Sequence, residues 1–160
     1  MVDVREAQTK DGEHVRRLTA SVFADFAMFQ KLLPKFFATP GVTTYLASSA
    51  GEVVGFVMLG FLPWTGGRDG DNPWIADILA IGVDPGHQRK GIGSALMHQA
   101  LELVRLMEEW RELKEIQLTC DASNQGAVRF FEKHGLQVVQ AKLGTFLSGQ
   151  SAIRLTKKLS

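Results

Sequence analysis

The apolar positions follow helical spacing in some segments and strand-like runs in others. From Glu13 onward, apolar residues recur three or four positions apart, which predicts an amphipathic helix over residues 13–26. The same spacing predicts helices over 28–37, 92–110 and 124–134, the last ended by Gly135. Runs rich in β-branched and aromatic residues predict strands. These runs are residues 2–5, 42–48, 53–61, 74–83, 115–120, 136–139 and 152–159.

This order of elements predicts one α/β domain over residues 1–160, in which helices pack on a mixed sheet. The run 74–83 (WIADILAIGV) is almost wholly apolar, so we expect a central strand buried on both faces. Asp77 is the only charged residue in that run. An unpaired buried carboxylate would cost several kcal/mol, so Asp77 has either a partner or a function.

Composition narrows the class of protein. Of the 160 residues, 45% are hydrophobic and 22% charged, as in soluble globular proteins. A formal net charge of +1 gives no general attraction to nucleic acid or to anionic membranes. The longest apolar run, residues 53–64, is too short to cross a bilayer, and the first residues do not resemble a secretory signal, so we expect a cytoplasmic protein. The single cysteine, Cys120, excludes an internal disulfide.

The stretch GHQRKGIGSAL (residues 86–96) is a glycine-rich loop followed by good helix formers. It is not a Walker A loop, because the lysine precedes the second glycine, and it lacks the third glycine of a dinucleotide fingerprint. Gly91 and Gly93 let backbone N–H groups approach an anion at the start of a helix, and Arg89 and Lys90 add positive charge. The alternative is a tight strand-to-helix turn without a ligand.

Two blocks carry a resemblance to a known family. Residues 83–96 (VDPGHQRKGIGSAL) resemble the acetyl-CoA loop of the GNAT superfamily of N-acetyltransferases, with its Gln/Arg-x-x-Gly-x-Gly/Ala signature. Residues 124–136 (NQGAVRFFEKHGL) resemble the family's Asn-x-x-Ala-x-x-Phe-Tyr-x-x-x-Gly-Phe helix. The resemblance implies a single GNAT-like domain with a mixed, mostly antiparallel sheet, splayed parallel central strands and flanking helices. It also implies acetyl-CoA as the acetyl donor and no metal.

The resemblance further implies where acetyl-CoA binds. Its pyrophosphate would lie on the backbone N–H groups of the glycine loop, and its pantetheine arm along the end of strand 74–83. The implied contact residues lie in the strand, the loop and the second block. They are Ile81, Gly82, Val83, Gln88, Arg89, Lys90, Gly91, Ile92, Gly93, Ser94, Asn124, Ala127 and Phe131. For Gly82 the residues also favour a bulge or the close approach of another backbone, and for Asn124 a helix cap is the alternative.

Two catalytic residues follow from the same resemblance. The N–H of Ile81 would donate to the oxyanion of a tetrahedral intermediate, and Asp77 matches the position of a catalytic Glu in several family members. The alternative for Asp77 is a carboxylate satisfied by backbone or by an arginine near the start of the strand. Phe131 stands where many members have the tyrosine that protonates the CoA thiolate. The thiolate then leaves unaided, a water or Cys120 substitutes, or the protein turns over slowly or not at all.

The acceptor is the least defined part of the prediction. The family binds it with the first helices and the loop after the third strand, here residues 23–37 and 63–73. The first segment is rich in phenylalanine, and the loop carries Arg68, Asp69 and Asp71. The sequence favours a primary amine in a small molecule or peptide, and leaves open a protein N-terminus or lysine and a non-catalytic acyl-CoA-binding module. Family members often dimerise through C-terminal strands, which leaves a homodimer open as well.

Overall fold

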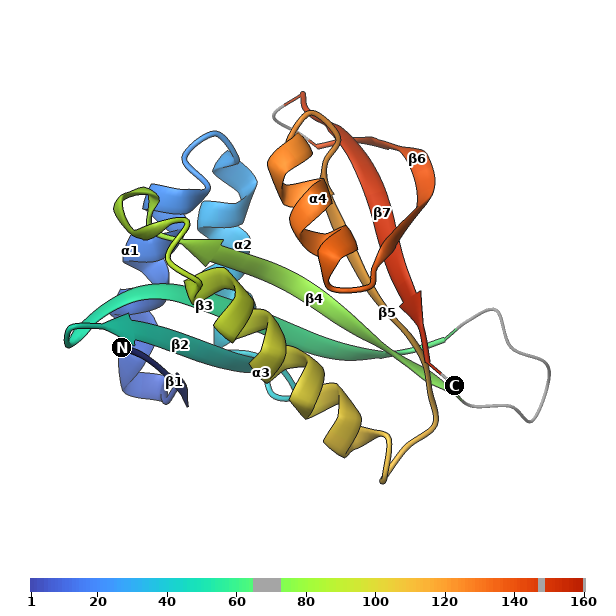
Figure 1. The fold of residues 1–160 in the computed structure, drawn as a ribbon, viewed down its shortest axis with the longest axis horizontal. Helices are drawn as coiled ribbons and strands as arrows, with labels where there is room; N and C mark the ends of the chain where they lie inside the picture. Colours follow the sequence, from blue (N-terminus) through green and yellow to red (C-terminus); the bar gives the residue numbers. More distant parts are fainter. Residues whose placement is uncertain (65–72, 147–148, 160) are drawn as a thin grey trace. The chain divides into compact units, whose positions relative to one another are not determined.

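The computed structural model describes residues 1–64, 73–146 and 149–159, which form an alternation of strands and helices (Figure 1). The strands are β1 (Val2–Glu6), β2 (Thr43–Ser49), β3 (Glu52–Pro63), β4 (Trp74–Val83), β5 (Leu113–Asp121), β6 (Gln137–Thr145) and β7 (Ser151–Lys158). The helices are α1 (Gly12–Val22), α2 (Ala27–Phe37), α3 (Ile92–Met107) and α4 (Gln125–Lys133), with short 3₁₀ turns η1 (Thr9–Asp11) and η2 (Pro85–His87).

The strands form a seven-stranded sheet in the order β1-β2-β3-β4-β5-β7-β6. The pairs β1–β2, β2–β3, β5–β7 and β6–β7 are antiparallel, and the central pair β4–β5 is parallel. The β4–β5 ladder runs from Trp74 to Ile78, while β4 itself continues to Val83. The prediction of a mixed sheet with a parallel central pair and flanking helices is therefore confirmed.

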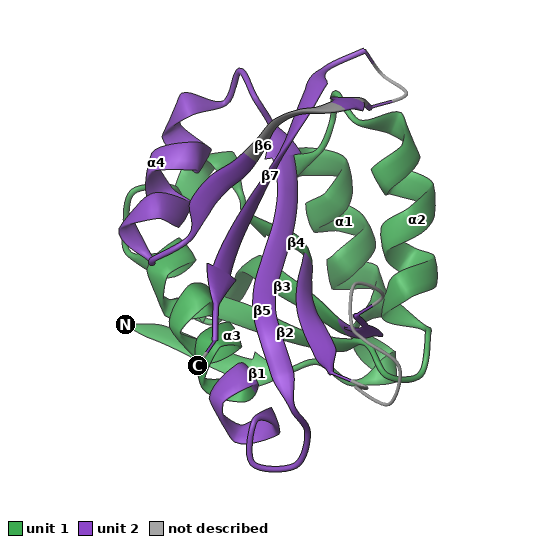
Figure 2. Cartoon of the chain, turned by 90° about the vertical axis from the view of Figure 1, so that its right-hand side faces the viewer, with its two compact units in different colours: residues 1–60, 79–103 green, residues 61–78, 104–160 purple. Residues whose placement is uncertain are grey.

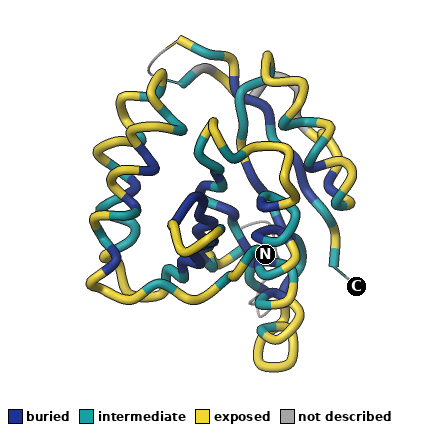
Figure 3. The backbone as a smooth tube through the Cα atoms, turned by 60° about the vertical axis from the view of Figure 1, so that its left-hand side comes forward, coloured by how far each residue is buried: buried dark blue, intermediate teal, exposed yellow. Residues whose placement is uncertain are grey.

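The chain divides into two compact units, and β4 contributes to both (Figure 2). The first unit comprises residues 1–60 and 79–103. Helices α1 and α2 lie on one face of its strands and α3 on the other (Figures 1 and 2). The buried cluster on the α1–α2 side is Val15, Leu18, Leu33, Leu46, Val53, Phe56, Met58 and Ala80. The buried residues of α1 and α3 recur at helical spacing along one side of each helix (Figure 3).

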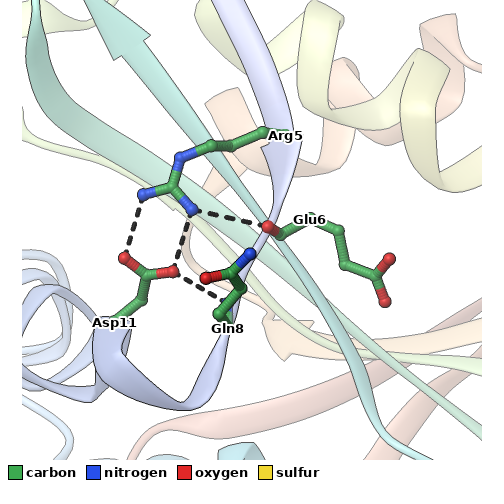
Figure 4. Close-up of polar contacts among 4 residues, drawn as sticks. All are labelled: Arg5, Glu6, Gln8 and Asp11. Carbon is green, nitrogen blue, oxygen red and sulfur yellow. Dashed lines mark hydrogen bonds and ion pairs between the residues drawn. The ribbon is translucent and has the colours of Figure 1, made fainter.

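An ion pair links the start of the first unit's sheet to its first helix. Arg5 of β1 donates from Nη1 and Nη2 to the two carboxylate oxygens of Asp11, at 2.8 and 2.9 Å (Figure 4). The backbone N–H of Gln8 donates to Asp11 Oδ2 at 2.8 Å. The Asp11 side chain is only 4% exposed, so these bonds replace the water that it loses on folding.

The second unit comprises residues 61–78 and 104–160. Helix α4 and the strands beside it line a shallow hollow, in which Val128 and Arg129 of α4 meet Val138 of β6 and Ile153 of β7. This contact places α4 on the face of the sheet that carries Ile153. Because alternate strand residues face opposite sides, the neighbours of Ile153 in β7 point away from α4.

Three sequence-based predictions about these elements are wrong. The first helix ends at Val22 and not at residue 26, because Phe23 leaves the helical conformation, with φ −111° and ψ 41°, although its N–H still donates to the carbonyl of Thr19. Helix α3 ends at Met107, so Trp110 follows it in a turn and is 83% exposed. In both α1 and α3, the helical spacing of apolar residues in the sequence continues past the last residue of the helix that packs. Strand β4 is not buried on both faces, since Asp77, Ile81 and Val83 are only half-buried.

Candidate active site

Asp77 lies within the second unit, in the stretch of β4 that pairs with β5. Its register partner is Gln117, whose Nε2 donates to Asp77 Oδ2 at 3.4 Å, near the upper limit for a hydrogen bond. Burial raises the pKa of Asp77, while the Gln117 hydrogen bond and the charge of Arg154 lower it by less. A raised pKa makes a carboxylate a stronger base, which suits the acceptance of a proton from an ammonium. No backbone donor to Asp77 occurs among the described residues, so the backbone-satisfied alternative is not what the structure has.

An arginine does influence Asp77, but only through its charge: Arg154 of β7 makes no hydrogen bond or ion pair to it among the described residues and is not near the start of β4. Asp77 pairs with Gln117, Gln117 with Thr156, and Thr119 with Arg154. Register partners point to the same face, so these five side chains share the face of the sheet away from α4. Sequence reasoning missed Gln117 and Arg154. Arg154 had a weak signal, since it is a cation between two apolar residues, Ile153 and Leu155.

The glycine loop lies within the first unit, between β4 and α3. The N–H of Asp84 donates to the carbonyl of Val54 in β3 at 2.7 Å, which fixes the start of the loop. Gln88 turns back and donates from Nε2 to the carbonyl of Val83 at 3.2 Å. Gln88 is thus held by the strand that it follows, and its backbone leads into the residues that precede α3.

Two residues of the loop have left-handed backbone conformations. Gly91 has a φ of +80° and Arg89 a φ of +64°, which is uncommon and strained for an arginine. Left-handed residues alternating with ordinary ones turn successive N–H groups toward one point, an arrangement that binds anions. Residues 88–91 are exposed, and the carbonyl of Gly91 accepts the first helical bond of α3, from Ala95. The loop therefore fits a phosphate group at a helix N-terminus.

Gly82 allows the close approach of a helix. A Cβ built on Gly82 would lie 2.6 Å from Cγ1 of Val22, the last residue of α1. On another side, a Cβ built on Gly55 would lie 3.0 Å from the Gly82 carbonyl oxygen. The prediction of close approach is correct, but the nearest group is the Val22 side chain and not a backbone. The end of α1 thus packs directly beside Ile81 and Val83.

The second block forms α4 and its cap. The Asn124 side-chain oxygen accepts from the N–H of Ala127 at 3.1 Å, so the helix-cap alternative is what the structure has. The Asn124 side chain still has its amide N–H groups and a second lone pair on Oδ1 with which it could contact pantetheine. Phe131 is 5% exposed and packs edge-on against Phe130, with ring centroids 5.4 Å apart. Gly135 follows the helix with a φ of +94°, as expected for its end.

Neither residue considered as a proton donor to the CoA thiolate is well suited. Burial, with a smaller contribution from Asp121, raises the pKa of the Cys120 thiol to about 11. Cys120 is therefore a weaker acid than an ordinary thiol. Tyr45, the only tyrosine, is buried in β2 of the first unit, where it is hydrogen-bonded to Gln99 and its pKa is raised mainly by burial.

Of the two predicted acceptor segments, the structure describes the first. Phe23, Phe26 and Phe29 form an aromatic cluster between α1 and α2, with Phe26 and Phe29 stacked at 5.4 Å. Phe23 also packs edge-on against Phe56 of the buried cluster, so part of this group belongs to the core. Arg68, Asp69 and Asp71 lie outside the described residues.

The sequence matches the model of the acetyltransferase (GNAT) family over residues 5–136. The chain belongs to the GNAT family. It is thus an acyltransferase, and the resemblance carried by the two sequence blocks is confirmed. Within the described residues, no helix is both long and apolar enough to span a membrane, and no three His, Cys, Asp or Glu side chains cluster as metal ligands would.

Individual relatives are distant. L-amino acid N-acetyltransferase AaaT of Escherichia coli K12 is 26% identical over 145 residues, which are 84% of this chain and 82% of that protein. Mycothiol acetyltransferase of Thermobispora bispora is 34% identical over 91 residues, which are 57% of this chain but 28% of that enzyme. These names give acyl transfer as the shared chemistry and leave the acceptor of this chain undetermined.

Solved structures agree on the fold. Arabidopsis thaliana NAA60 in complex with acetyl-CoA superimposes with a TM-score of 0.80 over 99% of both chains, at 14% identity. The ribosomal-protein-S18-alanine N-acetyltransferase from Escherichia coli gives a TM-score of 0.77 over 100% of this chain and 95% of that one, at 19% identity. At these identities the likeness establishes the fold alone.

Proposed function

We propose that this GNAT protein transfers the acetyl group of acetyl-CoA to a primary amine by direct attack of the amine on the thioester. The observation that carries the proposal is the conformation of the glycine loop. Arg89 and Gly91 are left-handed, and the loop is exposed at the start of α3. This is the backbone geometry that a pyrophosphate requires, and it immediately follows the strand that carries the candidate catalytic residues.

In the proposed reaction, Gln88, Arg89, Lys90, Gly91, Ile92, Gly93 and Ser94 bind the pyrophosphate. The acceptor ammonium loses one proton to Asp77, directly or through water, and the neutral nitrogen attacks the thioester carbonyl carbon. A C–N bond forms, and the carbonyl oxygen becomes an oxyanion that accepts from the N–H of Ile81. The intermediate then collapses, the C–S bond breaks, and the second amine proton ends on the CoA thiolate.

The thiolate departs without a dedicated side-chain acid. Phe131 has no proton to give, and Cys120, with a pKa of about 11, is a weaker acid than the CoA thiol. The thiol of CoA is itself acidic enough to leave as the thiolate, so the proton released by the attacking nitrogen suffices. We assign Gly82, Val83, Asn124, Ala127 and Phe131 to binding of the pantetheine arm, as the family resemblance implies.

The test is acetyl-CoA binding by calorimetry, combined with CoA thiol release in the presence of a broad panel of amines. Gly91→Ala places a Cβ in open space, so any effect comes from the left-handed backbone. Gly41→Ala is a matched control, because Gly41 also has a left-handed φ, of +89°, and open space around it. Both variants should lose about 1 kcal/mol of stability.

Only Gly91→Ala should weaken acetyl-CoA binding, by up to about tenfold, because binding must restore a conformation that alanine disfavours. Equal binding by the two variants would show that the loop is a structural turn. Binding without thiol release across the whole panel would contradict amine acetylation.

A further inference from the structure

Arg154 is a half-buried cation, and one atom of its guanidinium lacks a hydrogen-bond partner among the described residues. Its Nε is inaccessible to solvent and unpaired within the described part of the chain. Buried polar atoms are nearly always hydrogen-bonded, so a buried unpaired guanidinium nitrogen calls for an explanation. Arg154 is also a residue for which an anion is the natural partner, since its planar donors match a carboxylate.

Arg154 shares its sheet face with the candidate base. The pairs Asp77–Gln117, Gln117–Thr156 and Thr119–Arg154 place these side chains on the face opposite α4. Arg154 lies on the second strand from β4, and two residues along β7 from the position level with Asp77. This separation corresponds to about 12 Å between the two Cα atoms. The arginine charge reaches Asp77, where it is the smallest of three influences on the carboxylate.

Other charged residues lie toward the two ends of this face. Asp121 Oδ1 accepts from the N–H and the hydroxyl of Ser123, at 2.9 and 2.8 Å. Glu115 and Lys158 are direct register partners at the other end of the face, an arrangement that favours opposite charges. Asp77, with one long hydrogen bond, and Arg154, whose Nε has no partner among the described residues, are thus opposite charges near the middle of this face. A molecule with an ammonium at one end and a carboxylate at the other matches both.

We propose that Arg154 binds the carboxylate of the acceptor while Asp77 faces its amine, so that the acceptor is a small amino acid with a free carboxylate. The proposal rests on the proposed function and names the substrate class for that site. Gln117 lies between the two in the strand register and donates to Asp77. The acceptor's proton passes from the ammonium to the Asp77 carboxylate, while Arg154 keeps its charge throughout.

The test compares each L-amino acid with the amine that lacks its carboxylate. The amine is the more basic of the two, so the decisive readout is how the ratio changes between the wild type and the Arg154 variants. We expect the wild type to prefer the amino acid by about 10- to 100-fold in kcat/KM, the effect typical of a charge-assisted hydrogen bond. Arg154→Gln should bring this ratio close to one, mainly through the KM of the acceptor. Arg154→Lys should give an intermediate ratio, because it keeps the charge and loses the paired donors. If Arg154→Gln does not fold, the ratio measured for Arg154→Lys tests the proposal instead.

Lys158→Gln is the matched control, because it removes one positive charge from the same strand and face. It should keep the wild-type ratio. An active wild type that does not distinguish the two acceptors overturns the proposal, as does a preference that both Arg154 variants retain. Equal losses with both acceptors would make Arg154 a support for Asp77 and also overturn it. No turnover with any amine would instead refute the proposed function, on which this proposal depends.

Discussion

Two aspartates influenced by arginines have pKa values shifted in opposite directions. In the first unit, Asp11 accepts two hydrogen bonds from Arg5 and one from the backbone of Gln8, and these hold its pKa well below the usual range (Figure 4). In the second unit, Asp77 accepts one long hydrogen bond from Gln117 and senses Arg154 only through its charge, so burial raises its pKa.

The difference shows that direct hydrogen bonds, and not the mere proximity of an arginine, decide the state of a carboxylate. Asp11 is fully satisfied, so it fixes β1 to η1 and has no capacity left for chemistry. Asp77 is shielded from water without being satisfied, which is costly for stability and useful for a base. The three predictions below test this contrast between a structural and a reactive aspartate.

The largest expected effect is on catalysis. Asp77→Asn should lower kcat/KM for acetyl transfer by about 100-fold or more, because the amide cannot take a proton from the acceptor. The measurement is CoA thiol release at neutral pH with the best amine of the panel. Asp11→Asn, assayed at a temperature where it stays folded, should keep its wild-type rate. Full activity of Asp77→Asn would remove Asp77 as the base.

The next effect is on stability, where Asp11→Asn should have the larger effect and Asp77→Asn the smaller one. Asp11→Asn should lower the free energy of unfolding by about 2 kcal/mol, because it removes charge-assisted hydrogen bonds to Arg5. Asp77→Asn should leave it unchanged or raise it, since the folded protein disfavours the charged form of Asp77. Urea unfolding of both variants at pH 7 gives the comparison. Similar losses in the two variants would contradict the contrast.

The smallest effect is the pH dependence of these differences. Asp11 has a lowered pKa in the folded state, so its contribution is present above the unfolded pKa, about 3.9, and is lost as the pH falls below it. Asp77 has a raised pKa, so the folded protein takes up its proton first and the destabilising charge disappears as the pH falls toward about 3.9.

Unfolding measured from pH 7 to pH 3 should therefore show two opposite trends. The stability advantage of the wild type over Asp11→Asn should shrink toward low pH. Any advantage of Asp77→Asn over the wild type should also vanish, but at a higher pH. If both differences changed over the same pH range, the two carboxylates would share one environment, against the geometry described above.

Much of the fold could be predicted from the sequence, because each element is encoded locally. The apolar run of β4 was predicted with the bounds that the structure has, Trp74–Val83, and Gly135 was expected to end α4. The glycine loop was identified because its chemistry depends on neighbouring residues, whose backbone conformations and charges act together. The ends of α1 and α3 were not predicted correctly, since the helical spacing of apolar residues continues past the last residue that packs.

The sequence by itself determined the family, the loop and the candidate base, because these signals lie within short segments. Tertiary structure alone decided what surrounds the base. Gln117 and Arg154 are 40 and 77 positions from Asp77, and only the registers of β4 with β5 and of β5 with β7 bring them to one face. Strand register is set by the packing of the whole sheet, and a shift of one residue would turn Arg154 to the other face.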